Sequence, residues 1–357
     1  MPREVSFVMS RSALPRSLGP RRLLARNIVA LLVGAVSLAL CASQSRAAER
    51  LWYFDASGET LRNRAGTVVS YREGQWEFDV DGGGTLRLPT SRVVALDFES
   101  SESWTRGLRE FQEGRWESAY TDLIQAYRDE PREWAKLEIQ AVIVRCAVAT
   151  GRDEIACRAF QELLDTDPQT RHQGLVPLAW TRGVASAQWQ ATAEGWMRSD
   201  VEWDRLLGAS WLLQSPLKEP ARGVLIDLTN SRDKAVRFLA TMQLNRDELL
   251  TANAAQLTQW RTLIEEAPAE FRTGPRALAA QVAARLEPGD DAALAFLRTA
   301  LDQPSHELWI AEGLLGAARQ LAANSPQEAR AILDELLRRF PESDAAKLGR
   351  NLNLTTE

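Results

Sequence analysis

The sequence predicts a predominantly helical α+β protein, in which a small antiparallel β module precedes a long array of helical pairs. This prediction rests on a change in the spacing of apolar residues near residue 100. Residues 51–98 alternate apolar and polar side chains in short runs divided by turn residues, which is typical of strands. From residue 100 onward the apolar residues recur at helical spacing, and the spacing itself repeats along the chain.

The composition indicates a folded chain and excludes some classes of function. Of the 357 residues, 45% are hydrophobic and 25% are charged, as in globular proteins. The net charge is -5, and no Lys/Arg block follows the first 50 residues, so we do not expect a nucleic-acid partner. Twelve Trp are many for this length, whereas two His and three Cys leave little for metal or nucleophilic chemistry.

Residues 1–47 are predicted to be an export signal. An Arg-rich stretch precedes an apolar run of about 15 residues, 28–42, which is short for a bilayer core that needs about 20. Ser45 and Ala47 place small residues where signal peptidase cuts. We expect cleavage near Ala47 and a periplasmic or secreted protein; an uncleaved signal anchor is the alternative. Cleavage would remove seven Arg and one Glu, leaving 36 basic and 47 acidic residues.

Residues 48–99 are predicted to form the β module. Trp76, Phe78 and Val80 alternate with polar residues, the pattern of a half-buried strand. This central strand and its flanking Gly turns resemble small SH3-like or Sm-like barrels, which implies a curled sheet. We expect four or five strands, at residues 51–54, 67–71, 75–80, 85–88 and 93–98.

Residues 100–168 carry two copies of a helical repeat. In the first copy, small residues fall where two helices must cross and large apolar residues lie between them: Gly107, Gly114, Trp116, Ala119, Leu123, Ala126 and Pro131. This register resembles the tetratricopeptide repeat (TPR) family. The second copy begins 37 residues later: Gly151, Ala156, Phe160, Leu163 and Pro168.

The rest of the chain continues the array. Residues 266–350 repeat the TPR-like pattern, and 351–357 form a tail. Residues 169–265 keep the helical period but lose the TPR spacing, as HEAT-like pairs do. We expect one irregular α-solenoid, because helical pairs that expose an apolar face need stacked neighbours. Two separate helical arrays, divided near residues 168–177, are the alternative.

The TPR resemblance implies a groove along the inner helices that holds a peptide. Carrying the family's groove positions onto this sequence gives Ser101, Trp104, Leu108, Phe111 and Gln112 in the first copy, and Glu138, Ala141, Arg145, Val148 and Ala149 in the second. The candidate groove is Trp104, Leu108, Gln112, Glu138 and Arg145, with Trp104 and Arg145 as the principal contacts. The Lys and Asn of the family's carboxylate clamp are missing at these positions, so a peptide C-terminus is not the expected ligand.

Two further patterns each allow two interpretations. Cys146 and Cys157 flank the turn at Gly151 at similar heights, so they could form a disulfide if both face the partner helix; otherwise they are buried thiols. A series of Trp recurs at spacings of 7 to 9: Trp180, Trp189, Trp196, Trp203 and Trp211. Such a stripe could bind a sugar or a peptide, but core packing is the favoured interpretation.

No catalytic constellation is evident. Neither His172 nor His306 has a second His, Cys or Asp four residues further on, so a metal site is not expected. A Gly-x-Ser-x-Gly motif and a phosphate loop are also missing. We therefore predict an exported, non-enzymatic protein-protein interaction scaffold without a cofactor, which binds a protein or peptide in the cell envelope and no membrane after cleavage. An envelope glycan-binding protein that uses exposed Trp, or a carboxylate-dependent hydrolase, is the alternative.

Overall fold

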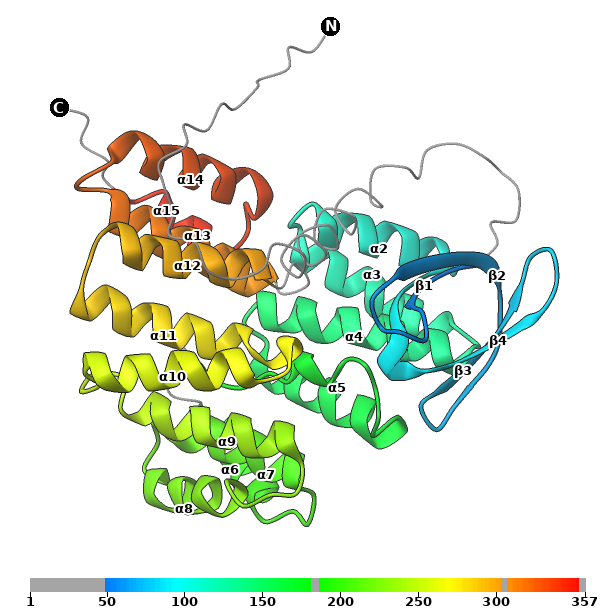
Figure 1. The fold of residues 1–357 in the computed structure, drawn as a ribbon, viewed down its shortest axis with the longest axis horizontal. Helices are drawn as coiled ribbons and strands as arrows, with labels where there is room; N and C mark the ends of the chain where they lie inside the picture. The colour runs from blue at the N-terminus through cyan, green and yellow to red at the C-terminus, as the bar shows by residue number, and fades with distance from the viewer. Residues whose placement is uncertain (1–48, 181–185, 303–306, 353–357) are drawn as a thin grey trace, which may run out of the picture. The chain divides into compact units, whose positions relative to one another are not determined.

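The structure is a computed structural model that describes residues 49–180, 186–302 and 307–352 (Figure 1). The predicted export signal, His306 and residues 353–357 of the predicted tail lie outside the described residues. Within them, no helix is both long enough and apolar enough to span a bilayer. The described chain is predominantly helical and begins with a small antiparallel sheet, which confirms the predicted fold class at this level.

The sheet contains five strands in the order β4-β3-β2-β1-β5, and each strand is antiparallel to its neighbours. Trp76 and Phe78 are buried on one face, as their alternation predicts. The second strand starts at Leu61 instead of residue 67, because its polar first half pairs with β1. The strands are β1 (Glu49–Phe54), β2 (Leu61–Arg72), β3 (Gln75–Val80), β4 (Thr85–Pro89) and β5 (Val93–Asp97).

Two helical hairpins follow, where the repeat pattern predicts them. Gly114 connects the helices of the first hairpin with φ +73°, a left-handed conformation that glycine adopts without a steric cost. The hairpins are α2 (Glu102–Gln112) with α3 (Trp116–Asp129), and α4 (Glu133–Ala149) with α5 (Asp153–Thr166).

The chain then continues as helices that pack mainly on their sequence neighbours. They are α6 (Ala187–Met197), α7 (Glu202–Leu212), α8 (Lys218–Leu228), α9 (Lys234–Asp247), α10 (Ala254–Glu266), α11 (Thr273–Leu286), α12 (Asp290–Asp302), α13 (Glu307–Leu321), α14 (Pro326–Arg339) and α15 (Asp344–Gly349). The described residues also contain three short 3₁₀ helices: η1 (Thr90–Arg92) between β4 and β5, η2 (Gln173–Leu175) between α5 and α6, and η3 (Ala269–Phe271) between α10 and α11.

The last helices of the array return to its first ones. The rings of Trp116 and Phe340 lie 5.8 Å apart, and a Cβ atom on Gly114 would lie 2.5 Å from the carbonyl oxygen of Arg339. Helix α13 also packs against α4 (Figure 1). The helices therefore close on themselves, which the local repeat pattern could not indicate because these contacts join segments that lie far apart in the sequence, such as Arg145 with Glu307 and Trp116 with Phe340.

The β module and the helices share one hydrophobic core. The ring of Phe98 stacks on Trp104 at 5.2 Å and meets Trp134 edge-on at 5.1 Å, so aromatic contacts fasten the sheet to α2 and α4. Eleven of the twelve Trp side chains are at most 9% exposed, and Trp196 is partly buried. Core packing of the Trp series is thus confirmed.

Candidate functional site

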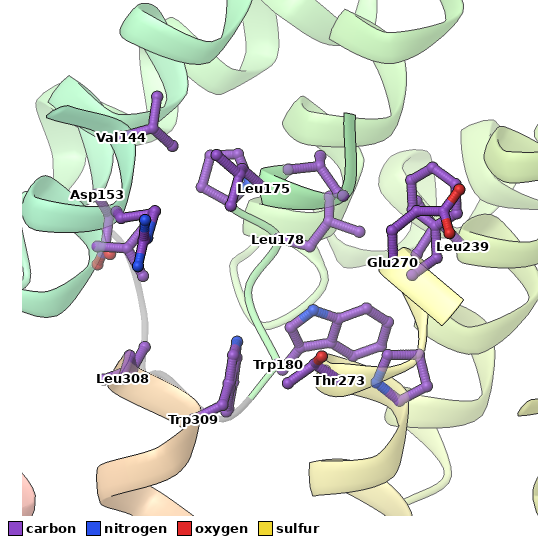
Figure 2. A pocket seen from close by; sticks show the side chains of 18 of the residues that line it. Val144, Asp153, Leu175, Leu178, Trp180, Leu239, Glu270, Thr273, Leu308 and Trp309 are labelled. Carbon is purple, nitrogen blue, oxygen red and sulfur yellow. The ribbon is translucent and has the colours of Figure 1, made fainter. Parts of the chain in front are cut away.

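A small pocket, partly open to solvent, lies between helices from both halves of the array (Figure 2). We call it the central pocket. Five parts of the chain line it: Val144, Arg145, Val148 and Asp153 around α4; Gly174–Leu178 and Trp180; Trp211 of α7 and Leu239 of α9; Glu270, Phe271 and Thr273–Pro275; and Glu307–Trp309 of α13.

The walls of the central pocket are mainly apolar. Leu175, Leu178 and Trp180 face it from one side, and Leu308 and Trp309 from another (Figure 2). The lining also includes the polar residue Thr273 and the charged residues Arg145, Asp153, Glu270 and Glu307. The pocket therefore combines an apolar lining with a few polar groups, which is the usual make-up of a binding site.

Residues 173–180 form a wall without regular helix or strand apart from η2, so hydrogen bonds to neighbouring helices must hold it in place. The indole N–H of Trp211 donates to the carbonyl oxygen of Pro177 at 3.0 Å. The main-chain N–H of Ala179 donates to Ser210 Oγ at 2.9 Å, and Ser210 Oγ donates to Gln243 Oε1 at 3.0 Å. These bonds fix the wall to α7 and α9.

A buried cation lies behind this wall. Arg246 is 4% exposed, and its Nη1 donates to the carbonyl oxygen of Ser210 and to Gln243 Oε1, both at 2.9 Å. Burial lowers the pKa of Arg246 to about 10, so the guanidinium is still charged at neutral pH. A buried charge is costly unless it is hydrogen-bonded, and this network therefore specifies how α7, α9 and the wall pack together.

The N-terminus of α11 forms another side of the central pocket. The helix begins at Thr273, and no side chain caps its first turn, where the N–H groups lack intrahelical partners. Thr273 is 4% exposed, and its Oγ1 has no hydrogen-bond partner among the described residues. A Cβ atom on Gly274 would lie 2.1 Å from Nε1 of Trp180, so only glycine lets the indole lie against this turn.

The charged residues of the pocket are mostly acidic. Arg145 pairs with Glu307 of α13, with 3.1 Å between Nε and Oε2, and its guanidinium lies 4.8 Å from the ring centroid of Phe111. The other charged residues of the lining are Asp153 and Glu270. The pair of Arg145 and Glu307 is neutral overall.

A second polar cluster joins the β module to the helices, and we call Tyr71, Glu138, Asp167, Arg171 and His172 the inter-module cluster. Arg171 Nε donates to Glu138 Oε1 at 3.2 Å, and His172 Nε2 lies 3.1 Å from the same oxygen. Tyr71 of β2 donates to Asp167. These side chains bind one another across the junction, which indicates a structural role.

Burial and charge shift the pKa values of this cluster. Burial opposes ionisation of Glu138, but Arg171 and His172 outweigh it and hold the pKa of Glu138 at about 2. Burial lowers the pKa of His172, although Glu138 opposes that shift. Burial and the bond to Asp167 raise the pKa of Tyr71. At neutral pH the cluster thus holds an ionised Glu138 and a neutral His172.

The structure separates the five candidate groove residues. Arg145 lines the central pocket. Trp104 is buried against Phe98, and Glu138 is buried in the inter-module cluster. Leu108 is partly buried against the core, and Gln112 is exposed on α2. The family's groove positions therefore do not form one surface here, because the β module covers the start of α4 and the array closes over its far end.

Cys146 and Cys157 are not bonded to each other. Both thiols are buried; Sγ of Cys146 lies 3.0 Å from the carbonyl oxygen of Trp116, and Sγ of Cys157 lies 3.6 Å from that of Pro177. The two side chains thus point to different neighbouring segments instead of toward the partner helix. This geometry fits the interpretation as two buried thiols and does not fit the alternative of a disulfide between them.

Most of the pocket was not evident from the sequence. Trp180, Thr273 and Trp309 come from three segments that only the closure of the array brings together. The sequence offers one local indication of the pocket walls, because glycine and proline mark irregular backbone and close approaches. Such residues occur as Gly174 with Pro177 and as Gly274 with Pro275. Among the described residues, no group of three or more His, Cys, Asp or Glu is arranged to hold a metal ion.

Comparisons with known proteins add no relative. No protein-family model, curated protein or solved structure matches the chain significantly.

Proposed function

We propose that the mature chain is an exported, non-enzymatic interaction scaffold that binds a segment of a partner protein from the cell envelope in the central pocket. The helical array is in this proposal a TPR/HEAT-like solenoid that has closed on itself, and the β module is a small SH3-like or Sm-like sheet that stabilises its first hairpins. The chain requires no cofactor for this role.

The observation that carries the proposal is the composition of the central pocket. Its walls are mainly Leu, Val, Pro, Trp and Phe side chains, which are the residues that bury apolar groups of a ligand. Its carboxylates include Glu307, which is neutralised by Arg145. This combination suits the binding of an apolar segment better than acid-base chemistry on a substrate.

A library of displayed peptides, selected on the immobilised mature chain, tests this function. Leu308 is partly buried at the pocket, so Leu308→Arg should place a charge there and weaken the selected peptides at least tenfold. Leu301→Arg is the matched control, because Leu301 is 69% exposed and is not among the pocket residues. Affinities measured by titration calorimetry should fall for the first variant only.

Three results would contradict the proposal: peptides that bind Leu308→Arg as well as the unchanged protein, no peptide selected at all, or turnover of a peptide or oligosaccharide by the purified chain. Oligosaccharides belong in the same experiment, because Trp180 and Trp309 line the pocket and aromatic rings also stack on sugars. A sugar that binds while peptides do not would favour the glycan-binding alternative.

A further inference from the structure

We propose that Arg171 is a positioning residue of the central pocket, through which the β module holds the first part of the pocket wall; the effect on ligand affinity rests on the proposed function. Arg171 belongs to the inter-module cluster, and Gly174–Val176, which line the pocket, follow it within a few residues. We call residues 167–176 the connecting segment. The junction between the β module and the helices then determines the shape of the pocket.

Arg171 fastens the connecting segment to two other elements. Its Nη1 donates to the carbonyl oxygen of Val94 in β5 at 2.7 Å, and its Nε donates to Glu138 Oε1 of α4 at 3.2 Å. The side chains of Arg171 and Glu138 are both largely buried, and removal of one partner of a buried ion pair leaves a costly unpaired charge. The anchor at Arg171 therefore ties the connecting segment firmly to the β module and to α4.

Hydrogen bonds within the connecting segment link this anchor to the pocket wall. Nε2 of Gln173 donates to the carbonyl oxygen of Pro168 at 2.8 Å. The main-chain N–H of Leu175 donates to the carbonyl oxygen of His172 at 2.9 Å, and that of Val176 donates to the carbonyl oxygen of Gln173 at 3.2 Å. The segment is thus one hydrogen-bonded unit, so a displacement at its anchor would be carried to the wall.

The first part of the wall has little room to move without changing the pocket. A Cβ atom on Gly174 would lie 2.6 Å from the carbonyl oxygen of Glu270, so η2 lies directly against η3. Leu175 faces the pocket (Figure 2). The hydrogen bonds from α7 reach Pro177 and Ala179, which lie further along the wall. The placement of Leu175 therefore depends on the anchor in the inter-module cluster.

Hydrogen exchange of the ligand-free mature chain, measured by mass spectrometry, tests this positioning role without a ligand. Arg171→Met removes the anchor's hydrogen bonds and keeps most of its volume, so exchange at residues 173–176 should become about tenfold faster. Arg132→Met is the matched control. Arg132 also binds a carboxylate and a main-chain carbonyl at the junction, those of Glu49 and Glu99, but its bonds hold the start of α4 instead of the connecting segment. It should leave exchange at residues 173–176 unchanged.

Peptide affinity gives a second measurement at the same site. Arg171→Met should weaken the peptides selected on the unchanged chain about tenfold in titration calorimetry, whereas Arg132→Met should bind them as the unchanged chain does. Arg171→Lys keeps a positive charge beside Glu138 and should recover part of the lost affinity. If no peptide can be selected, the proposed function fails, and the exchange measurement still decides the positioning role.

Two results would overturn the inference: equal exchange at residues 173–176 in the Arg171 and Arg132 variants, or faster exchange there with unchanged affinity for the selected peptides. Arg171→Met leaves the buried carboxylate of Glu138 without its guanidinium. If circular dichroism shows that this variant does not fold, Arg171→Met/Glu138→Gln, which removes both charges, takes its place with the same expected results.

Discussion

Thr273 shows how a single buried hydroxyl can reduce stability. Its hydroxyl is buried at the start of α11 without a partner, although a threonine hydroxyl usually finds a backbone acceptor in folded proteins. Valine has nearly the same shape and no polar atom, so it would remove the unsatisfied group without leaving a cavity.

Thr273→Val should therefore raise the free energy of unfolding of the ligand-free protein by about 1 kcal/mol. Urea denaturation of the variant and of the unchanged protein measures this difference. A variant less stable than the unchanged protein would show that the hydroxyl has a partner within the chain.

Cysteine reactivity is a second test at the scale of residues. Burial raises the pKa of Cys146 to about 12, and the thiolate is the reactive form of cysteine. In the native mature chain, iodoacetamide should modify neither Cys146 nor Cys157, and in urea it should modify both. Mass spectrometry counts the added groups. Rapid labelling of the native protein would disprove the buried geometry, and no labelling in urea would reveal a disulfide.

At the scale of elements, the sequence predicts those parts of the fold that depend on neighbours along the chain. The alternation around Trp76 and the turn at Gly114 locate β3 and the first helical hairpin, because period and turn chemistry are local properties. The polar first half of β2 was missed, since only its pairing with β1 makes it a strand. Residues 173–180 have no period, and long-range hydrogen bonds give them their structure.

The candidate site was harder to predict than the helices. The TPR-like register placed Glu138 and Arg145 on the same open face of α4, but the neighbours of α4 determine which side chains are accessible. The β module and Arg171 enclose Glu138, whereas Arg145, two turns further on, reaches Glu307 and the central pocket. A register that assumes an open solenoid cannot distinguish these two positions.

The junction between the β module and the helices should weaken in acid. Burial lowers the pKa of His172 below its ordinary value of 6.5, so below that pH the unfolded chain binds a proton that the folded protein does not. Stability is then complete above about pH 6.5 and falls as the pH decreases below it. Glu138, with a pKa of about 2 against an ordinary 4.5, adds a second loss below about pH 4.5.

Urea denaturation between pH 8 and pH 5 measures this dependence. The unchanged protein should lose stability steadily below pH 6.5, and His172→Gln, which keeps a neutral donor toward Glu138, should lose less over the same range. If the free energy of unfolding falls equally with decreasing pH in both proteins, His172 does not titrate as its buried position requires.

At the scale of the whole molecule, the contact between the two ends of the array couples the stability of one end to that of the other. Phe340 is buried at the end of α14 and meets Trp116 at the start of α3. In an open solenoid each repeat contacts only its neighbours, so damage at one end would not reach the other. In the closed array, damage at one end should also destabilise the other end.

Phe340→Ala should cost about 3–5 kcal/mol of stability and should speed amide hydrogen exchange at residues 113–117 as well as in α14. Phe160→Ala is a suitable control, because Phe160 is equally buried and packs against Trp203 on the opposite part of the array. It should cost a similar amount without accelerating exchange at residues 113–117. Identical exchange at that loop in both variants would indicate that the ends do not touch in solution.

The most direct test of a peptide site inside this closed array is photo-crosslinking. A peptide selected on the mature chain, with benzophenylalanine in its apolar core, is irradiated with that chain, and the crosslinked residues are mapped by mass spectrometry. We predict crosslinks within residues 144–148, 174–180, 271–275 and 307–309, which line the central pocket. Crosslinks confined to the outer helices, such as α8 or α10, or no crosslink at a concentration that saturates binding, would contradict the account.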